Sequence, residues 1–192
     1  MTKTVLIEGF TEKGAGYARL NSGKKITIPN SVVGDIVEVD CRSKNRKGRI
    51  VAITTPSSMR TETICEHATI CGGCSWQQMD YTSLLATKQS IIEKQFKSSF
   101  PTASLAAIIP CTPPWLYRNK MEFSFAENAK KTQYLGLVMT GGSHFVFNVK
   151  KCYLAPPWFS ELLTQIRQWL SHSPYDCYHI RTGTGLLRTL TL

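Results

Sequence analysis

Short runs of hydrophobic residues, separated by turn residues, occupy the first 55 positions of the chain. Glycine and asparagine interrupt these runs every few residues, which is typical of short strands joined by tight turns. Strands at this density favour a small barrel. We therefore predict an all-β domain over residues 1–55, with strands at about 4–10, 17–20, 24–28, 36–39 and 50–53.

The pattern changes after residues 54–58, whose sequence Thr-Thr-Pro-Ser-Ser predicts a linker. Apolar residues then recur with helical spacing, which predicts a helix over about 81–97. A second helix, with an apolar stripe facing the core, is predicted to begin at the proline pair 156–157. The chain is thus mainly β, and its second part, residues 56–192, combines α and β elements. Its strands are predicted at about 120–126, 133–139, 144–149 and 187–192.

A surplus of positive charge indicates a polyanionic partner. The chain has 23 basic and 13 acidic residues and a net charge of +10, which is expected of a protein that contacts phosphates. Five of the eight residues at 42–49 are basic, and they would lie at a hairpin tip between two predicted strands. We favour RNA contact for this loop over a purely solubilising role. The candidate residues are Arg42, Lys44, Arg46, Lys47 and Arg49.

Membrane and secretion signals are missing from the hydrophobic pattern. No apolar stretch approaches the roughly 20 residues needed to span a bilayer. Residues 1–4 lead directly into a strand pattern rather than into the apolar segment of a signal peptide. We therefore expect a cytoplasmic protein without membrane association. In that compartment the seven cysteines would be reduced, and their odd number also argues against a disulfide framework.

Three of the cysteines form the pattern C-x5-C-x2-C, at Cys65, Cys71 and Cys74. Two thiolates two residues apart can bind one metal centre if the backbone turns tightly between them. Gly72 and Gly73 permit that turn, because neither residue is penalised for positive φ. Three local thiolates and a distant fourth are a common way to hold an iron–sulfur cluster.

Spacing alone leaves the fourth ligand and the metal open. Cys111 and Cys152 are the main candidates for the fourth thiolate, and Cys41 and Cys177 are weaker ones. Zinc and an iron–sulfur cluster are equally compatible with four cysteines, and three buried cysteines without a metal are the remaining alternative. His67 lies inside the loop and is either a ligand or a local hydrogen-bonding residue. The five-residue gap disfavours the C-x3-C-x2-C pattern of radical enzymes that use S-adenosylmethionine.

Four segments together carry a family resemblance. Residues 65–78, with the sequence CEHATICGGCSWQQ, resemble the cluster segment of the RNA uracil-5-methyltransferases of the RumA type. Residues 117–120, Tyr-Arg-Asn-Lys, look like a motif of the same family. Residues 135–137, leading to residues 148–152, match the strand pair that delivers its last cluster cysteine. Residues 13–18 resemble part of a TRAM domain, an OB-like RNA-binding module. The resemblance covers essentially the whole chain.

The resemblance implies an OB-like TRAM barrel followed by an α/β domain that holds a structural 4Fe-4S cluster. It also implies RNA-contacting groups at Arg118 and Lys120, whose alternative role is an ion pair at a strand edge with Glu122. Trp76 would either pack beside the cluster or stack on a base. The implied cluster ligands are Cys65, Cys71, Cys74 and Cys152.

Members of this family transfer a methyl group from S-adenosylmethionine to C5 of a flipped uracil. A cysteine thiolate attacks C6, and a carboxylate then removes the C5 proton. The resemblance implies that the full-length protein is a monomeric RNA uracil-5-methyltransferase, with 23S rRNA as its favoured substrate. The alternative is a stand-alone RNA-binding module with a metal site made of four cysteines.

The family's catalytic groups lie in a Rossmann-like domain that follows the part resembled here. We find no predicted strand followed by a glycine-rich cofactor loop. The sequence Gly-Thr-Gly at 183–185 is an isolated GxG and is too short to indicate such a loop. We therefore assign no catalytic residue and no S-adenosylmethionine-binding residue in these 192 positions. We expect the chain to end before the catalytic domain and to be inactive alone.

We predict that the 192-residue chain neither binds S-adenosylmethionine nor methylates RNA by itself. A nucleophile, a base and a cofactor must converge within about 3 Å of the reacting atoms, and the sequence offers no such set. Calorimetric titration with S-adenosylmethionine should therefore show no saturable heat. Saturable binding would place a cofactor site within these residues, and methyl transfer to uridine would contradict the prediction outright.

Overall fold

The computed structural model describes residues 2–41, 46–140 and 145–192. They form two compact units. The first consists of Met1–Thr63 and Ser75–Pro110, and the second consists of Ile64–Cys74 and Cys111–Leu192. Each unit is therefore built from two separate stretches of sequence. The domain boundary at residue 55 rests on the sequence pattern and stays a prediction.

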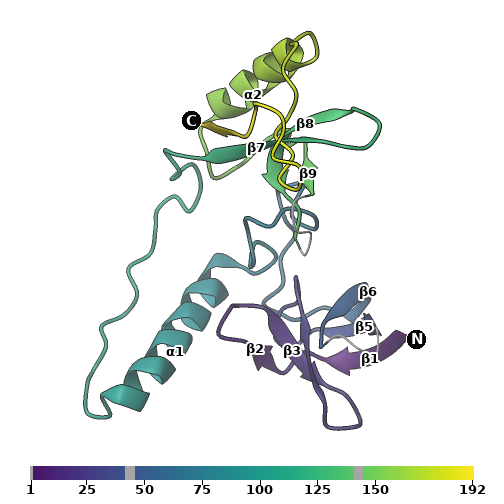
Figure 1. The fold of residues 1–192 in the computed structure, drawn as a ribbon. Coiled ribbons are helices and arrows are strands. Elements are labelled where there is room, and N and C mark those ends of the chain that lie inside the picture. The colour runs from purple at the N-terminus through teal and green to yellow at the C-terminus, as the bar shows by residue number, and fades with distance from the viewer. Residues whose placement is uncertain (1, 42–45, 141–144) are drawn as a thin grey trace. The chain divides into compact units, whose positions relative to one another are not determined.

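Six strands in two antiparallel sheets begin the first unit (Figure 1). One sheet has the order β1-β5-β6 and the other the order β2-β3-β4. Burial alternates along β5, as expected of a strand with one face toward a core. The all-β start predicted from the sequence is confirmed. The strands are β1 (Thr2–Leu6), β2 (Gly9–Phe10), β3 (Gly16–Arg19), β4 (Lys25–Ile28), β5 (Ile36–Cys41) and β6 (Gly48–Thr55).

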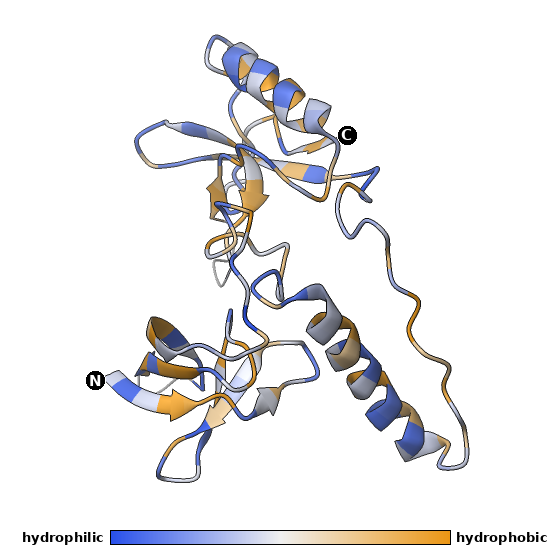
Figure 2. Ribbon diagram, turned by 180° about the vertical axis from the view of Figure 1, so that it is seen from behind, coloured by the Kyte–Doolittle hydropathy of each residue, from blue (hydrophilic) through white to orange (hydrophobic). Residues whose placement is uncertain are grey.

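Helix α1 (Tyr81–Ser99) belongs to the same unit. The Asp80 carboxylate caps its N-terminus by accepting a hydrogen bond from the Ser83 N–H at 2.9 Å. The helix predicted over 81–97 is confirmed and extends two residues further. No residue of α1 is buried, and hydrophobic and hydrophilic residues both occur along its length (Figure 2). In the part of the chain that the structure describes, no helix combines the length and hydrophobicity needed to cross a membrane.

A four-stranded antiparallel sheet and one helix form the second unit. The strands are β7 (Glu122–Glu127), β8 (Gln133–Val138), β9 (Val146–Phe147) and β10 (Thr189–Thr191), in the order β10-β7-β8-β9. Helix α2 (Pro157–Leu170) begins at a proline, whose fixed φ suits the first helical position. The mainly β composition predicted from the sequence is confirmed. The helix and the sheet share a core that includes Phe123, Leu135, Val149, Phe159, Leu163 and Leu170.

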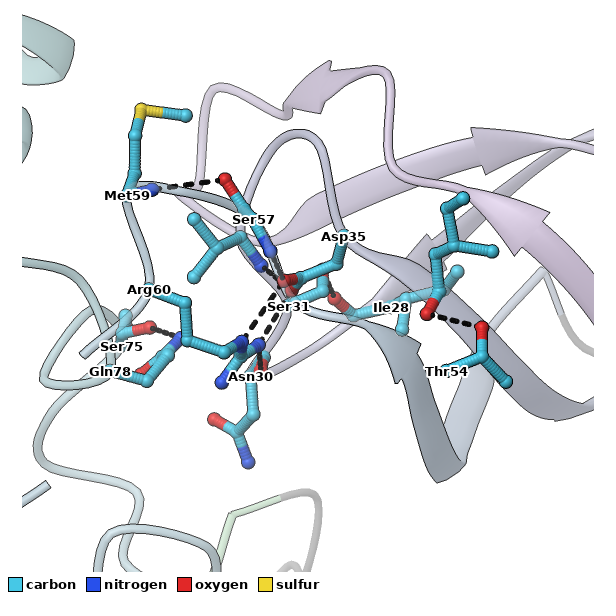
Figure 3. Close-up of polar contacts among 12 residues, drawn as sticks. Ile28, Asn30, Ser31, Asp35, Thr54, Ser57, Met59, Arg60, Ser75 and Gln78 are labelled. Atoms are coloured by element: carbon cyan, nitrogen blue, oxygen red, sulfur yellow. Dashed lines mark hydrogen bonds and ion pairs between the residues drawn. The ribbon is translucent and has the colours of Figure 1, made fainter. Parts of the chain in front are cut away.

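A buried ion pair joins the barrel strands to the segment that follows them (Figure 3). The Asp35 carboxylate is fully buried and accepts hydrogen bonds from the Val32 N–H at 2.7 Å and the Ser57 N–H at 2.9 Å. The Arg60 guanidinium donates to the same carboxylate from Nε at 3.0 Å and from Nη2 at 2.6 Å. The linker predicted at 54–58 is therefore partly wrong, because β6 runs to residue 55 and Ser57 is buried and hydrogen-bonded.

These hydrogen bonds decide the charge state of Asp35. Burial raises the pKa of this carboxyl, but the hydrogen bonds from Arg60, Ser57 and Val32 outweigh burial, so the pKa lies below its ordinary value. Because the folded-state pKa is below the unfolded-state value, the ionised pair stabilises the fold at neutral pH. That contribution is lost as the pH falls from about 3.9 through the folded-state pKa.

We expect Arg60→Met to lower the free energy of unfolding of the first unit by about 3 kcal/mol at neutral pH, because it leaves a buried carboxylate without its counterion. The deficit should shrink below about pH 4, as Asp35 becomes protonated in both proteins. Hydrogen exchange at the β5 amides, followed at neutral pH and below pH 4, measures the loss in the free energy of unfolding.

Arg19→Met is the matched control for this substitution. Arg19 lies 3.8 Å from Glu8, and its side chain is 59% exposed. Removing such an exposed pair should cost about 0.5 kcal/mol or less. A loss from Arg60→Met as small as the control's would show that the buried pair contributes little to stability.

Candidate metal centre

The loop that carries the first three cysteines extends the pairing of the second unit's sheet beyond the end of β8. Residues 70–72 pair with residues 138–140 through an antiparallel bridge at Cys71, with backbone hydrogen bonds of 3.1 and 2.8 Å on either side. Gly72 suits this approach, because a Cβ there would lie 3.2 Å from the Val138 carbonyl oxygen. The sheet therefore determines where the loop sits.

Turns inside the loop bring Cys65 toward Cys71 despite the five residues between them. The His67 carbonyl accepts hydrogen bonds from two N–H groups further along the loop, at 3.0 and 2.7 Å, the second from Cys71 itself. The Ala68 N–H donates to the Cys65 carbonyl at 3.1 Å. The Gly73 N–H donates to Cys71 Sγ at 3.3 Å.

His67 connects this loop to the segment that carries Cys152. The Lys150 N–H donates to His67 Nε2 at 3.0 Å. The imidazole ring also packs on the Phe147 ring, with 5.0 Å between the ring centroids. Lys150 Nζ forms an ion pair with Glu66 at 3.0 Å. Two side chains of the loop therefore contact the residue that lies two positions before Cys152.

Two of the four cysteines predicted as ligands, Cys65 and Cys74, have pKa values raised by burial and by charge on the others. Burial first, and then negative charge on Cys71, Cys152 and Cys65, raises the pKa of the Cys74 thiol to about 11. Burial, and then charge on Cys71 and Cys152, also raises the pKa of Cys65, although a backbone hydrogen bond from His67 favours its thiolate. Negative charge on these thiols therefore opposes ionisation of Cys65 and Cys74, and a bound cation would relieve that repulsion.

The other three cysteines lie elsewhere. Cys41 is half-buried at the end of β5, and Cys111 is exposed. Cys177 is buried, and burial followed by the charges of Glu127 and Asp176 raises the pKa of its thiol to about 11. None of these three contributes to the pKa shifts of Cys65 and Cys74.

The described residues contain no group of three or more His, Cys, Asp or Glu side chains arranged to hold a metal ion. The ligand roles of the four cysteines therefore stay a prediction. Four cysteines suit the iron–sulfur cluster that the family resemblance implies, because thiolates are the ligands of iron–sulfur clusters and of structural zinc.

The basic residues predicted to contact RNA are found in both units. Arg42 and Lys44 lie outside the described residues. Arg46, Lys47 and Arg49 are exposed around the start of β6. The Arg46 carbonyl accepts a hydrogen bond from the N–H of residue 27 on β4 at 2.8 Å. The backbone just before β6 is therefore attached to the β2-β3-β4 sheet.

In the second unit, Arg118 and Lys120 are both exposed. The Arg118 N–H donates to the Leu154 carbonyl at 2.8 Å, which holds the backbone of the Tyr-Arg-Asn-Lys segment. Among the ion pairs of the described residues, none joins either side chain to Glu122. The two cationic groups are therefore accessible to a ligand.

Trp76 packs within the first unit, a role that the sequence did not reveal. Its Nε1 donates a hydrogen bond to the Gly14 carbonyl, and its ring lies 5.5 Å from the Phe10 ring, centroid to centroid. Gly14 has a φ of +80°, and a Cβ there would meet the indole at 2.8 Å. The tryptophan thus packs against the loop between β2 and β3.

Comparison with known proteins shows that the chain is similar to RNA methyltransferases. A family model described as the TRAM domain matches residues 1–41. An uncharacterized RNA methyltransferase of Protochlamydia amoebophila is 37% identical over 169 residues, which is 86% of this chain and 38% of the relative. The 23S rRNA (uracil(1939)-C(5))-methyltransferase of Nitrosospira multiformis is 31% identical over 173 residues, or 88% of this chain and 39% of the relative.

A solved structure has a similar fold. The Pyrococcus abyssi tRNA (uracil-54, C5)-methyltransferase, in complex with S-adenosyl-L-homocysteine, superposes with a TM-score of 0.67 at 17% identity. The match covers 98% of this chain and 42% of that one. The chain spans about two-fifths of the length of the curated relatives that it matches. The resemblance to the RNA uracil-5-methyltransferases, predicted from the sequence, is confirmed.

Proposed function

We propose that this chain is the RNA-binding and cluster-bearing part of an S-adenosylmethionine-dependent RNA uracil-5-methyltransferase. The observation that carries the proposal is the match of a TRAM domain to residues 1–41 together with relatives named RNA methyltransferases. A relative that acts on 23S rRNA supports that RNA as the substrate. We place the protein in the cytoplasm as a monomer, and we assign the methyl transfer to residues outside this chain.

The proposed cluster is a 4Fe-4S centre bound by Cys65, Cys71, Cys74 and Cys152. When bound, it would supply a covalent cross-link between the loop at 64–74 and the segment after β9. Because the metal–thiolate bonds form only in the folded state, their free energy adds to the stability of the second unit. This assignment is supported by the backbone pairing of the loop with the sheet and by the effect of charge on Cys71 and Cys152 on the pKa values of Cys65 and Cys74.

The proposed RNA contacts are the exposed cations of the first unit at Arg46, Lys47 and Arg49, and those of the second unit at Arg118 and Lys120. We include Arg42 and Lys44 from the sequence pattern alone. Guanidinium groups can bind phosphate in a bidentate manner or stack on a base, whereas lysine binds phosphate as a point charge. The net charge of +10 favours the same partner.

A second candidate function is an RNA-binding module with a zinc ion on the same four cysteines. The donor set supports it as well as the cluster, because thiolates bind both. The two differ in metal content and in colour, since an iron–sulfur protein absorbs near 400 nm and a zinc protein does not.

We predict one 4Fe-4S cluster per chain after anaerobic purification. The variants Cys65→Ser, Cys71→Ser, Cys74→Ser and Cys152→Ser should each lose the brown colour, because each change removes one of the four thiolates. Iron and sulfide analysis together with the absorption spectrum provides the measurement.

Cys111→Ser is the control, because Cys111 is exposed and does not contribute to the pKa shifts of Cys65 and Cys74. It should leave the spectrum unchanged. One zinc per chain without iron would contradict the cluster and favour the second candidate function, an RNA-binding module with a zinc ion. Loss of colour in Cys111→Ser with retention in Cys152→Ser would reassign the fourth ligand.

We predict that the double variant Arg46→Ala, Lys47→Ala binds single-stranded RNA with a weaker salt dependence. Each lost phosphate contact lowers the slope of log K against log salt by about 0.7 on a single strand, so two contacts lower it by about 1.4. Fluorescence anisotropy with a labelled oligoribonucleotide over a salt series gives the slope.

The control is Lys94→Ala, Lys97→Ala, which removes the same charge from exposed positions of α1 in the same unit. If both double variants change the slope equally, the effect is one of net charge. In that case, or if the slope of Arg46→Ala, Lys47→Ala is unchanged, the hairpin is not an RNA-contacting surface.

A further inference from the structure

His67 has an unusual place for a polar residue in a surface loop. It is 6% exposed, and its Nε2 accepts a hydrogen bond from the Lys150 N–H at 3.0 Å. The donor is 83 residues away in the chain, so this bond is a tertiary contact. Because Nε2 is the acceptor in this hydrogen bond, it carries no hydrogen in this tautomer, whose ring N–H is on Nδ1.

The same residue organises the loop from inside. Its carbonyl accepts the N–H groups of Ile70 and Cys71 at 3.0 and 2.7 Å, and its ring packs on Phe147 at the end of β9. The backbone of His67 thus holds the turn between the first two cysteines. Its side chain holds the segment that ends in Cys152.

The hydrogen bond also decides between the two roles that the sequence leaves open. The Nε2 lone pair points at the Lys150 N–H and is therefore not available to a metal. A ring that is fixed by Phe147 and by a backbone donor is suited to holding a neighbouring ligand in place.

We propose that His67 is a positioning residue that holds the Cys152 segment against the three-cysteine loop, so that all four thiols are assembled before the cluster binds. This inference rests on the proposed cluster. The fourth cysteine lies far along the chain, and bringing it to the loop costs closure entropy that the partly buried hydrogen bond offsets. Without this hydrogen bond, the Cys152 segment is free to move away from the loop, and a bound cluster is lost faster.

The test compares His67→Gln, which keeps an acceptor near the position of Nε2, with His67→Phe, which keeps a ring and removes the acceptor. Each protein is purified anaerobically and reconstituted with ferrous iron and sulfide. The rate at which the 400 nm absorbance decays in the presence of an iron chelator, and the midpoint potential of the cluster, are then measured. His172→Phe, at an exposed position after α2, is the control.

We expect His67→Phe to lose its cluster about tenfold faster than the unmodified protein, because it removes the acceptor of the partly buried Lys150 N–H. His67→Gln should restore most of the lifetime and of the potential, and His172→Phe should match the unmodified protein. Equal lifetimes in His67→Phe and the unmodified protein would overturn the inference while leaving the cluster intact.

Amide exchange at Lys150 in the unmodified, metal-free chain keeps the inference testable if His67→Phe does not fold or if the chain binds no iron. A protected Lys150 amide supports the positioning role, and exchange as fast as that of Lys151 overturns it. The proposed cluster fails separately, if reconstitution incorporates no iron.

Discussion

The backbone pairing between the cysteine loop and the end of β8 is the constraint on which the candidate site depends. A loop with glycines at its tip has many conformations, and three thiols on such a loop do not define a site by themselves. Pairing of Cys71 with Met139 gives the loop one register on a sheet that packs against α2. Once that register is set, His67 comes within hydrogen-bonding distance of Lys150, and the Cys152 segment lies against the loop.

The first unit depends on a different kind of interaction. Its two small sheets share a core of mainly short aliphatic side chains. The segment that follows β6 is held by the buried carboxylate of Asp35, which takes hydrogen bonds from two backbone amides and from Arg60. A buried charge is costly unless every partner is in place. This network therefore fixes the path of the chain where it leaves the barrel strands, and Trp76 packs on the β2–β3 loop of the same unit.

The strands and the two helices could be predicted because each depends on local sequence, and the cysteine spacing is read from the sequence directly. Alternation around Val37 and Val39, the helical spacing behind Asp80 and the proline at the start of α2 are local signals. The buried Asp35–Arg60 pair could not be predicted, because the two residues lie 25 positions apart and neither stands in a recognisable motif. The linker prediction fails in the same segment because serine, threonine and proline are common in linkers and nothing local shows that Ser57 is buried.

The sequence by itself determined the β-rich start, the basic hairpin, the three-cysteine loop and the resemblance to RNA uracil-5-methyltransferases. These features depend on residue type and short spacing, which survive without any knowledge of the fold. Only the tertiary structure decided which distant residues meet: Arg60 with Asp35, Trp76 with Gly14, and His67 with Lys150. Each of these contacts is a hydrogen bond with one definite geometry. Its partner is selected by how the strands pack, so no pattern within the local sequence identifies it.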